Sequence, residues 1–120
     1  MKRWLLFLIV TTLALLAVSP VLAQEDMGCT HDDPTIAALR ECVVHAREMG
    51  HIDSDQVAQS LLKKLDKAQA SLDDGKGSNA IGKLEGFIEE VQEQAGEHID
   101  PIHAEHLIEH AQMVIAALGG

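Results

Sequence analysis

The chain has 120 residues, of which 19 are acidic and 9 are basic, so its formal net charge at pH 7 is −10 with histidine neutral. An acidic surface of this kind repels phosphate groups, which argues against binding to nucleic acids and to anionic lipid. Aromatic residues make up only 2% of the sequence. Recognition of bases or sugars by aromatic stacking therefore has almost no side chains to use.

Residues 1–23 have the features of a secretory signal peptide. Two basic residues precede an apolar run from Trp4 to Val18, and small residues, Val21 and Ala23, occupy the positions that a signal peptidase reads. We expect cleavage after Ala23 and an extracytoplasmic location, which is secreted, periplasmic or at the cell surface. The alternative is a retained membrane anchor, although the apolar run is shorter than the roughly 20 residues that span a bilayer.

Cleavage would make the remaining chain more acidic. Removing Lys2 and Arg3 from the 9 basic residues leaves 7 against 19 acidic ones, a net charge of −12. Residues 24–33 are polar and are expected to form a flexible tail. Residues 34–120 contain four segments of helical periodicity and no segment of strand periodicity, which predicts one small all-α domain.

Local signals bound the four expected helices. Residues that favour helix starts precede the segments: Pro34 or Thr35, Asp53, Ser78 or Asn79, and Asp100. Glycines suited to helix C-termini follow the first three segments: Gly50, Gly75 and Gly96. Gln56 can complete a capping box with Asp53, and Pro101 occupies the first turn of the last helix, where its missing N–H is harmless.

Each segment carries apolar residues three and four positions apart, which fall on one face of a helix. The four stripes are Ile36, Leu39, Val43 and Ala46; Val57, Leu61, Leu65, Ala68 and Leu72; Ile81, Leu84, Ile88, Val91 and Ala95, with Phe87 on the flank; and Ala104, Leu107, Ile108, Ala111, Val114, Ile115 and Leu118. Short connections between amphipathic helices predict an antiparallel four-helix bundle.

The sequence also repeats itself. Met49–Asp53 resembles Gly96–Asp100, and both contain His-Ile-Asp ahead of a helix whose apolar residues follow the same pattern. We expect two copies of a helical hairpin packed face to face. The alternative is a chance similarity between two amphipathic helices.

Two stretches within this region carry a family resemblance: Ser60–Leu65, with the sequence SLLKKL, and Phe87–Val91, with the sequence FIEEV. From about Ile52 to Gly120 the chain resembles the FIMAH domain, a small helical module found mostly near the C-termini of secreted bacterial and archaeal proteins, often beside hydrolases. The resemblance implies an accessory module without established catalytic residues.

Cys29 and Cys42 are the only cysteines. In an exported chain this pair predicts a disulfide that ties the tail to the first helix. Closing a loop of about 14 residues would contribute ~3 kcal/mol. The alternative is a zinc site of Cys29, His31, Cys42 and His45, because Cys42 and His45 lie one helical turn apart. Free or intermolecular thiols are a further possibility.

His103, His106 and His110 recur at helical spacing on the last helix. We expect them beside its apolar stripe, where they could face one surface groove and bind zinc, copper or nickel. The stretch is not the His-Glu-x-x-His motif of metalloproteases, because the glutamate at Glu109 does not directly follow His106. The alternative is a solvated helix flank, and no other cofactor is expected.

Gly82 and Gly86 lie one turn apart on the third helix, on the side away from its stripe. A strip without side chains would let another backbone approach closely, so it is a candidate docking surface; the alternative is a tolerant exposed surface. Lys63, Lys64 and Lys67 form the only basic cluster, which neighbouring acids would neutralise.

The sequence contains no nucleophile elbow and no glycine-rich phosphate loop, and a small bundle leaves little room for a substrate cleft. We therefore expect a protein that is not an enzyme. Two functions remain. The first is an exported interaction module that docks onto another exported protein or the cell surface. The second is a small extracytoplasmic zinc- or copper-binding protein that uses His103, His106 and His110.

Overall fold

The computed structural model describes Cys29 and residues 33–120. These residues form four α-helices: α2 (Ile36–Glu48), α3 (Asp55–Asp73), α4 (Gly77–Gln94) and α5 (Pro101–Ala117). Within the described residues there are isolated β-bridges and no strand. The all-α class is therefore confirmed. The expected signal peptide and all of the expected tail except Cys29 and Asp33 lie outside the described part of the chain.

Several helix ends follow from local sequence. Thr35 Oγ1 accepts a hydrogen bond from Ala38 N (3.1 Å) at the start of α2. Asp100 Oδ2 accepts one from His103 N (3.3 Å) at the start of α5, where Pro101 occupies the first turn. The three predicted terminal glycines have φ angles of 86°, 77° and 82° at Gly50, Gly75 and Gly96. Glycine adopts this left-handed conformation without the strain that a Cβ would introduce.

Two predicted N-caps are wrong. Ser54, and not Asp53, caps α3, because its Oγ accepts from Val57 N (3.3 Å) while Asp53 is held by a histidine from another connection. Lys76 is the N-cap residue of α4, and no side chain caps that helix. The turn at Gly75 is so short that the chain is already helical at Gly77, before the predicted caps Ser78 and Asn79.

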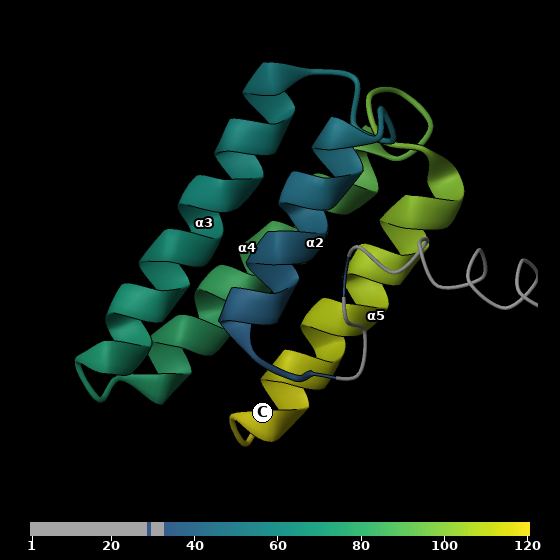
Figure 1. The fold of residues 1–120 in the computed structure, drawn as a ribbon. Coiled ribbons are helices and arrows are strands. Elements are labelled where there is room, and N and C mark those ends of the chain that lie inside the picture. Colours follow the sequence, from purple (N-terminus) through teal and green to yellow (C-terminus); the bar gives the residue numbers. More distant parts are fainter. Residues whose placement is uncertain (1–28, 30–32) are drawn as a thin grey trace, which may run out of the picture.

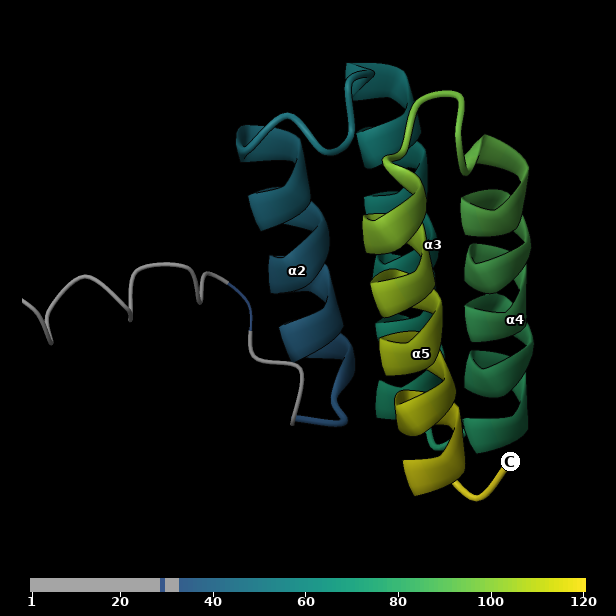
Figure 2. The same ribbon diagram turned by 90° about the vertical axis from the view of Figure 1, so that its right-hand side faces the viewer.

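The helices form a bundle in which α3 packs on α4, α4 packs on α5, and α2 packs on both α3 and α5. The α2–α3 and α4–α5 connections lie at one end of the bundle, and the α3–α4 turn lies at the other (Figure 1). The same arrangement is visible from the side in Figure 2. None of the helices within residues 33–120 is long and apolar enough to span a bilayer.

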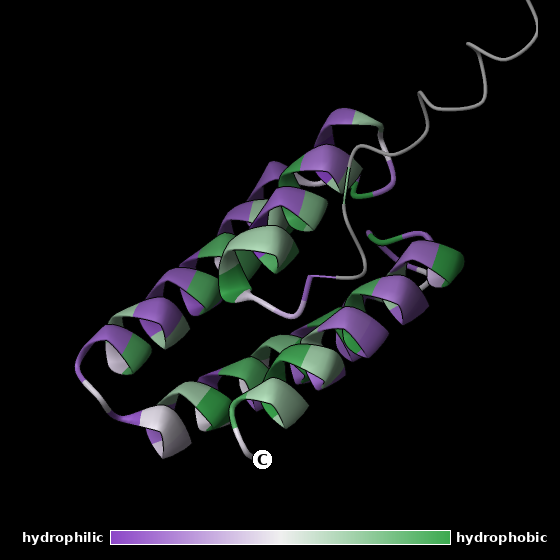
Figure 3. Cartoon of the chain, turned by 60° about the horizontal axis from the view of Figure 1, so that its bottom comes forward, coloured by the Kyte–Doolittle hydropathy of each residue, from purple (hydrophilic) through white to green (hydrophobic). Residues whose placement is uncertain are grey.

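The core lies between the helices and contains most residues of the predicted stripes. Apolar and polar residues alternate around each helix, which gives every helix an apolar side (Figure 3). The stripe of α4 differs from the prediction: Phe87 is fully buried with Leu84 and Val91, whereas Ile88 is only half-buried and Ala95 is exposed. The buried residues of α4 are Ala80, Leu84, Phe87 and Val91, so its buried stripe, which packs on both α3 and α5, is rotated toward Phe87 relative to the prediction.

Candidate functional site

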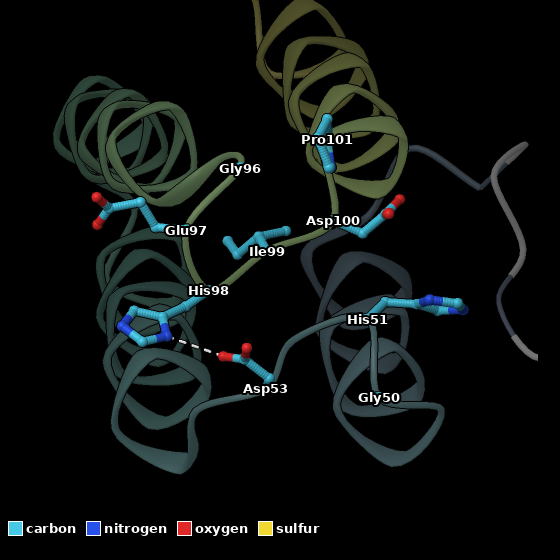
Figure 4. Close-up of a pocket in the computed structure, with 9 residues that line it drawn as sticks. All are labelled: Gly50, His51, Asp53, Gly96, Glu97, His98, Ile99, Asp100 and Pro101. Carbon is cyan, nitrogen blue, oxygen red and sulfur yellow. Dashed lines mark hydrogen bonds and ion pairs between the residues drawn. The ribbon is translucent and has the colours of Figure 1, made fainter.

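The two His-Ile-Asp segments lie against each other at one end of the bundle (Figure 4). Ile52 and Ile99 form an antiparallel bridge and are both buried. Asp53 N donates to His98 O (2.9 Å), and Asp100 N donates to the carbonyl oxygen of His51 (2.8 Å). The repeated segments of the sequence therefore pair in space and join the α2–α3 connection to the α4–α5 connection. We call this pairing the His-Ile-Asp junction.

Imidazoles and carboxylates surround the His-Ile-Asp junction. His98 Nδ1 donates to Asp53 Oδ1 (2.8 Å), and His103 Nδ1 donates to Asp100 Oδ2 (2.9 Å). The His51 ring stacks on the His103 ring, with centroids 3.5 Å apart and planes inclined by 14°. A pocket of about 210 Å³ lies among the residues that Figure 4 labels. Its volume suits a few waters and is below the range of ordinary small-molecule sites.

The electrostatics of the junction shift two pKa values. Burial lowers the pKa of His51 from its ordinary 6.5, and the neighbouring His103 lowers it further, against an opposing effect of Asp100. Hydrogen bonds from the side chain and then the backbone of His103 lower the pKa of Asp100. The arrangement therefore favours a neutral His51 beside an ionised Asp100.

The three histidines predicted on one face of α5 do not share a groove. The rings of His103 and His106 have centroids 6.0 Å apart with planes inclined by 67°. His110 is only 1% exposed and lies beside the cysteines. The expectation of a common surface groove is wrong for His110, because its position on α5 faces α2 and the start of the described chain. Metal binding by these three residues stays a prediction.

Cys29 and Cys42 form a disulfide, with their Cα atoms 4.7 Å apart, which confirms the predicted pairing. The imidazole beside it is that of His110, whose Nδ1 lies 3.5 Å from Cys42 Sγ and whose Nε2 donates to Asp33 O (2.7 Å). Among the described residues, Cys29, Cys42 and His110 are the one group of three potential metal ligands whose donor atoms all lie within 4.8 Å of one another. His45 is not in this group, and His31 lies outside the described residues.

A groove of about 460 Å³ runs between α3 and α4, lined by Lys64, Lys67, Ser78, Asn79, Gly82, Lys83 and Gly86. We call it the lysine–glycine groove. A Cβ added at Gly82 or Gly86 would meet no atom within 4 Å, so there is open space above the backbone at both positions. Lys64 Nζ pairs with Glu90 (2.9 Å). The ion pairs formed within residues 33–120 do not include Lys67 or Lys83.

Residues 36–116 match the sequence model of the FIMAH domain, a match that covers more than half of the chain and extends from the start of α2 to the last turn of α5. The chain belongs to the FIMAH domain family. The match begins at residue 36, earlier than the resemblance from about Ile52, and so includes α2. No curated protein and no solved structure matches the chain. Membership of the FIMAH family indicates an accessory domain.

Three arrangements in this FIMAH domain were not apparent from its sequence: Lys83 of α4 lines the same groove as the lysines of α3, His51 stacks on His103, and His110 lies beside the disulfide. Each joins residues from different helices or connections. Only the junction left a sequence signal, the repeated His-Ile-Asp, and that signal did not reveal that the two copies pair. Helical periodicity places a residue on a face and does not state which helix lies opposite.

Proposed function

We propose that this FIMAH domain is an exported, non-catalytic accessory module that docks onto another extracytoplasmic protein. The docking surface is the lysine–glycine groove, and the ligand is an extended acidic segment of the partner. The observation that carries the proposal is that Lys67 of α3 and Lys83 of α4 line the same groove as Gly82 and Gly86. A Cβ at either glycine would meet no atom within 4 Å.

Charge complementarity supports an acidic ligand. The chain as a whole carries a net charge of −10, so a groove lined by three lysines stands out from its surroundings and attracts anionic groups. Lys64 is already partnered by Glu90, which leaves Lys67 and Lys83 to pair with carboxylates of a visiting chain. Charges at the rim of an interface chiefly set the association rate and the choice of partner.

The exposed backbone of α4 in the groove favours an extended peptide as the ligand. The exposed Gly82 and half-buried Gly86 carry no side chain that would hold a peptide away from α4. At the N-terminal end of the groove, α4 begins without a side-chain cap. The first N–H groups of such a helix favour a carboxylate, both as donors and through the helix dipole.

The proposal includes the location and the architecture of the domain. We infer that residues 1–23 direct export and are removed, and the Cys29–Cys42 disulfide fits an oxidising compartment outside the cytoplasm. We also infer that the bundle is antiparallel and consists of two packed helical hairpins. The alternation of the connections between the two ends and the paired His-Ile-Asp segments support this arrangement.

The groove can be tested with a poly-glutamate peptide as the probe. We expect the full chain to bind it at about 0.15 M ionic strength, where salt screens the long-range repulsion between the acidic chain and the peptide. The double substitution Lys67→Ala with Lys83→Ala is expected to weaken binding at least about tenfold, equivalent to ~1.4 kcal/mol. The control is Lys63→Ala with Lys76→Ala, which removes the same charge from residues outside the groove lining. We expect this control to bind within about twofold of wild type.

The measurement is a fluorescence-anisotropy titration of labelled peptide. Equal losses in the two double variants would show attraction to net charge alone and would contradict the groove. Undetectable binding to the wild-type chain would also contradict an acidic ligand.

A further inference from the structure

We propose that reduction of the Cys29–Cys42 disulfide creates a buried zinc site with Cys29, Cys42 and His110 as its ligands. The site lies where the start of the described chain meets α2 and α5, away from the lysine–glycine groove between α3 and α4. It is therefore independent of the proposed docking surface. The disulfide is the closed form of the site, and the dithiol is the form that binds metal.

Cys42 Sγ and His110 Nδ1 already have the spacing of two zinc ligands, whereas the two Sγ atoms, which are bonded to each other in the disulfide, must move apart to ~3.8 Å after reduction. The two Sγ atoms and an imidazole nitrogen lie within 4.8 Å of one another, and Cys42 Sγ lies 3.5 Å from His110 Nδ1. A tetrahedral ion with Zn–S of about 2.3 Å and Zn–N of about 2.0 Å separates sulfur and nitrogen by ~3.5 Å. The exposed fractions are 9% for Cys29, 4% for Cys42 and 1% for His110.

A backbone carbonyl orients the histidine. His110 Nε2 lies 2.7 Å from the carbonyl oxygen of Asp33, and a carbonyl only accepts, so Nε2 carries the proton. In the neutral imidazole the lone pair is then on Nδ1, the nitrogen that faces Cys42 Sγ. Histidines that bind metals are held in this way, with the second nitrogen donating to a carbonyl or carboxylate.

The chemistry balances with a thiol reductant. Two thiols transfer two hydrogen atoms to the disulfide, which gives Cys29–SH and Cys42–SH and one external disulfide. Zinc then displaces the two thiol protons, and the two thiolates cancel its double positive charge. With a neutral imidazole the buried complex has no net charge, which limits the cost of desolvation.

The ligand set also selects the class of ion. Two thiolates and one imidazole are soft and borderline donors, which favour zinc over the oxygen-preferring ions magnesium and calcium. Three protein ligands leave a fourth position, which a water can fill.

Cobalt(II) serves as the spectroscopic probe, and zinc as the competitor. The full chain is reduced with a phosphine in the absence of oxygen and titrated with Co²⁺. We expect thiolate-to-cobalt charge-transfer absorption that saturates at one equivalent in the reduced chain, does not develop in the oxidised chain, and is lost on adding Zn²⁺. Binding of cobalt to the oxidised chain with the same absorption would overturn the proposal.

Two substitutions test the ligands in the reduced chain. His110→Gln is expected to weaken cobalt binding at least tenfold, whereas His106→Gln, an exposed histidine of the same helix, is expected to leave it within twofold. Circular dichroism reports whether each variant keeps its helices. If His110→Gln does not fold, Cys29→Ser decides the question, and we expect it to weaken binding at least tenfold. Undiminished binding in the folded variants would overturn the site.

Discussion

Asp100 and His103 show how single residues serve both local and tertiary structure. The Asp100 carboxylate accepts from the backbone N–H of His103, which caps α5, and from the His103 ring, which in turn stacks on His51. The cap was predictable from the sequence because it involves residues three positions apart. The stack was not, because His51 comes from the other connection.

The lowered pKa of His51 predicts a dependence of stability on pH. A lowered pKa means that folding favours the neutral ring, so the stabilisation is complete above about pH 6.5 and is lost as pH falls through the lower pKa of the folded state. We expect the free energy of unfolding to fall between pH 7 and about pH 5, and to fall less in His51→Gln. Urea denaturation at each pH measures it. Identical losses in the two proteins would contradict this role for His51.

Protonation of Asp100 also lowers the free energy of unfolding, but at lower pH. Its pKa is lowered, so its contribution is complete above the ordinary value of 3.8 and is lost as pH falls further. A measurement between pH 7 and about pH 5 therefore excludes the contribution of Asp100, and comparison with His51→Gln isolates that of His51.

Other single residues show where a prediction from the local sequence fails. Of the two predicted starts of the first helix, Pro34 and Thr35, it is Thr35 that caps α2. Asp53 was displaced as a cap by Ser54, and His98 holds its carboxylate across the junction. A helical wheel places His110 beside the apolar stripe of α5. The wheel does not show that His110 is buried, because its burial depends on α2 and the disulfide. A competing tertiary partner explains each of these differences.

Among the helices, α4 departs most from its predicted form. Its apolar residues allow two overlapping stripes, and contact with both α3 and α5 buries Phe87 at the centre. The other three helices bury most of the residues that their periodicity indicates, with additions such as Cys42 and His110. The exceptions are only half-buried: Leu72, Ile108, Ile115 and Leu118. Helix number, class and most ends were therefore predictable, whereas the rotation of a helix between two neighbours was not.

The glycines of α4 allow a prediction about helix stability and peptide binding. Alanine at Gly82 and at Gly86 should raise the free energy of unfolding by about 1 kcal/mol each, because alanine favours helix and a Cβ there meets no atom within 4 Å. The same substitutions should weaken poly-glutamate binding by narrowing the groove. Chemical denaturation measures the first effect, and the anisotropy titration measures the second.

Gly75→Ala is the matched control for stability. Its φ of 77° strains any residue with a Cβ, so this substitution should destabilise the domain. Higher stability of the two α4 variants with unchanged peptide binding would remove the glycine strip from the docking surface.

For the whole molecule, the pairing of the two His-Ile-Asp segments is the feature that unites the fold. It fixes the end of the bundle at which both connections lie and places Ile52 and Ile99 together in the core. The repeat was visible in the sequence, but its self-pairing was not, because similarity between two segments does not state that they touch. For the same reason the sequence did not show that Lys67 of α3 and Lys83 of α4 line one groove.

The two proposed sites use opposite chemistry on one small domain. The lysine–glycine groove is an exposed surface for carboxylates, whereas the Cys29, Cys42 and His110 cluster is buried and binds metal only after reduction. Because the sites involve different helices, α3 with α4 and α2 with α5, loss of one should leave the other intact.

The most direct test of the docking account is a ¹H–¹⁵N NMR titration of the full chain with the poly-glutamate peptide. We predict that the amide shifts change with peptide concentration at Lys67, Ser78, Gly82, Lys83 and Gly86, and that the amides of α2 and α5 stay constant. Shift changes confined to other helices, or no saturable changes at all, would contradict the account.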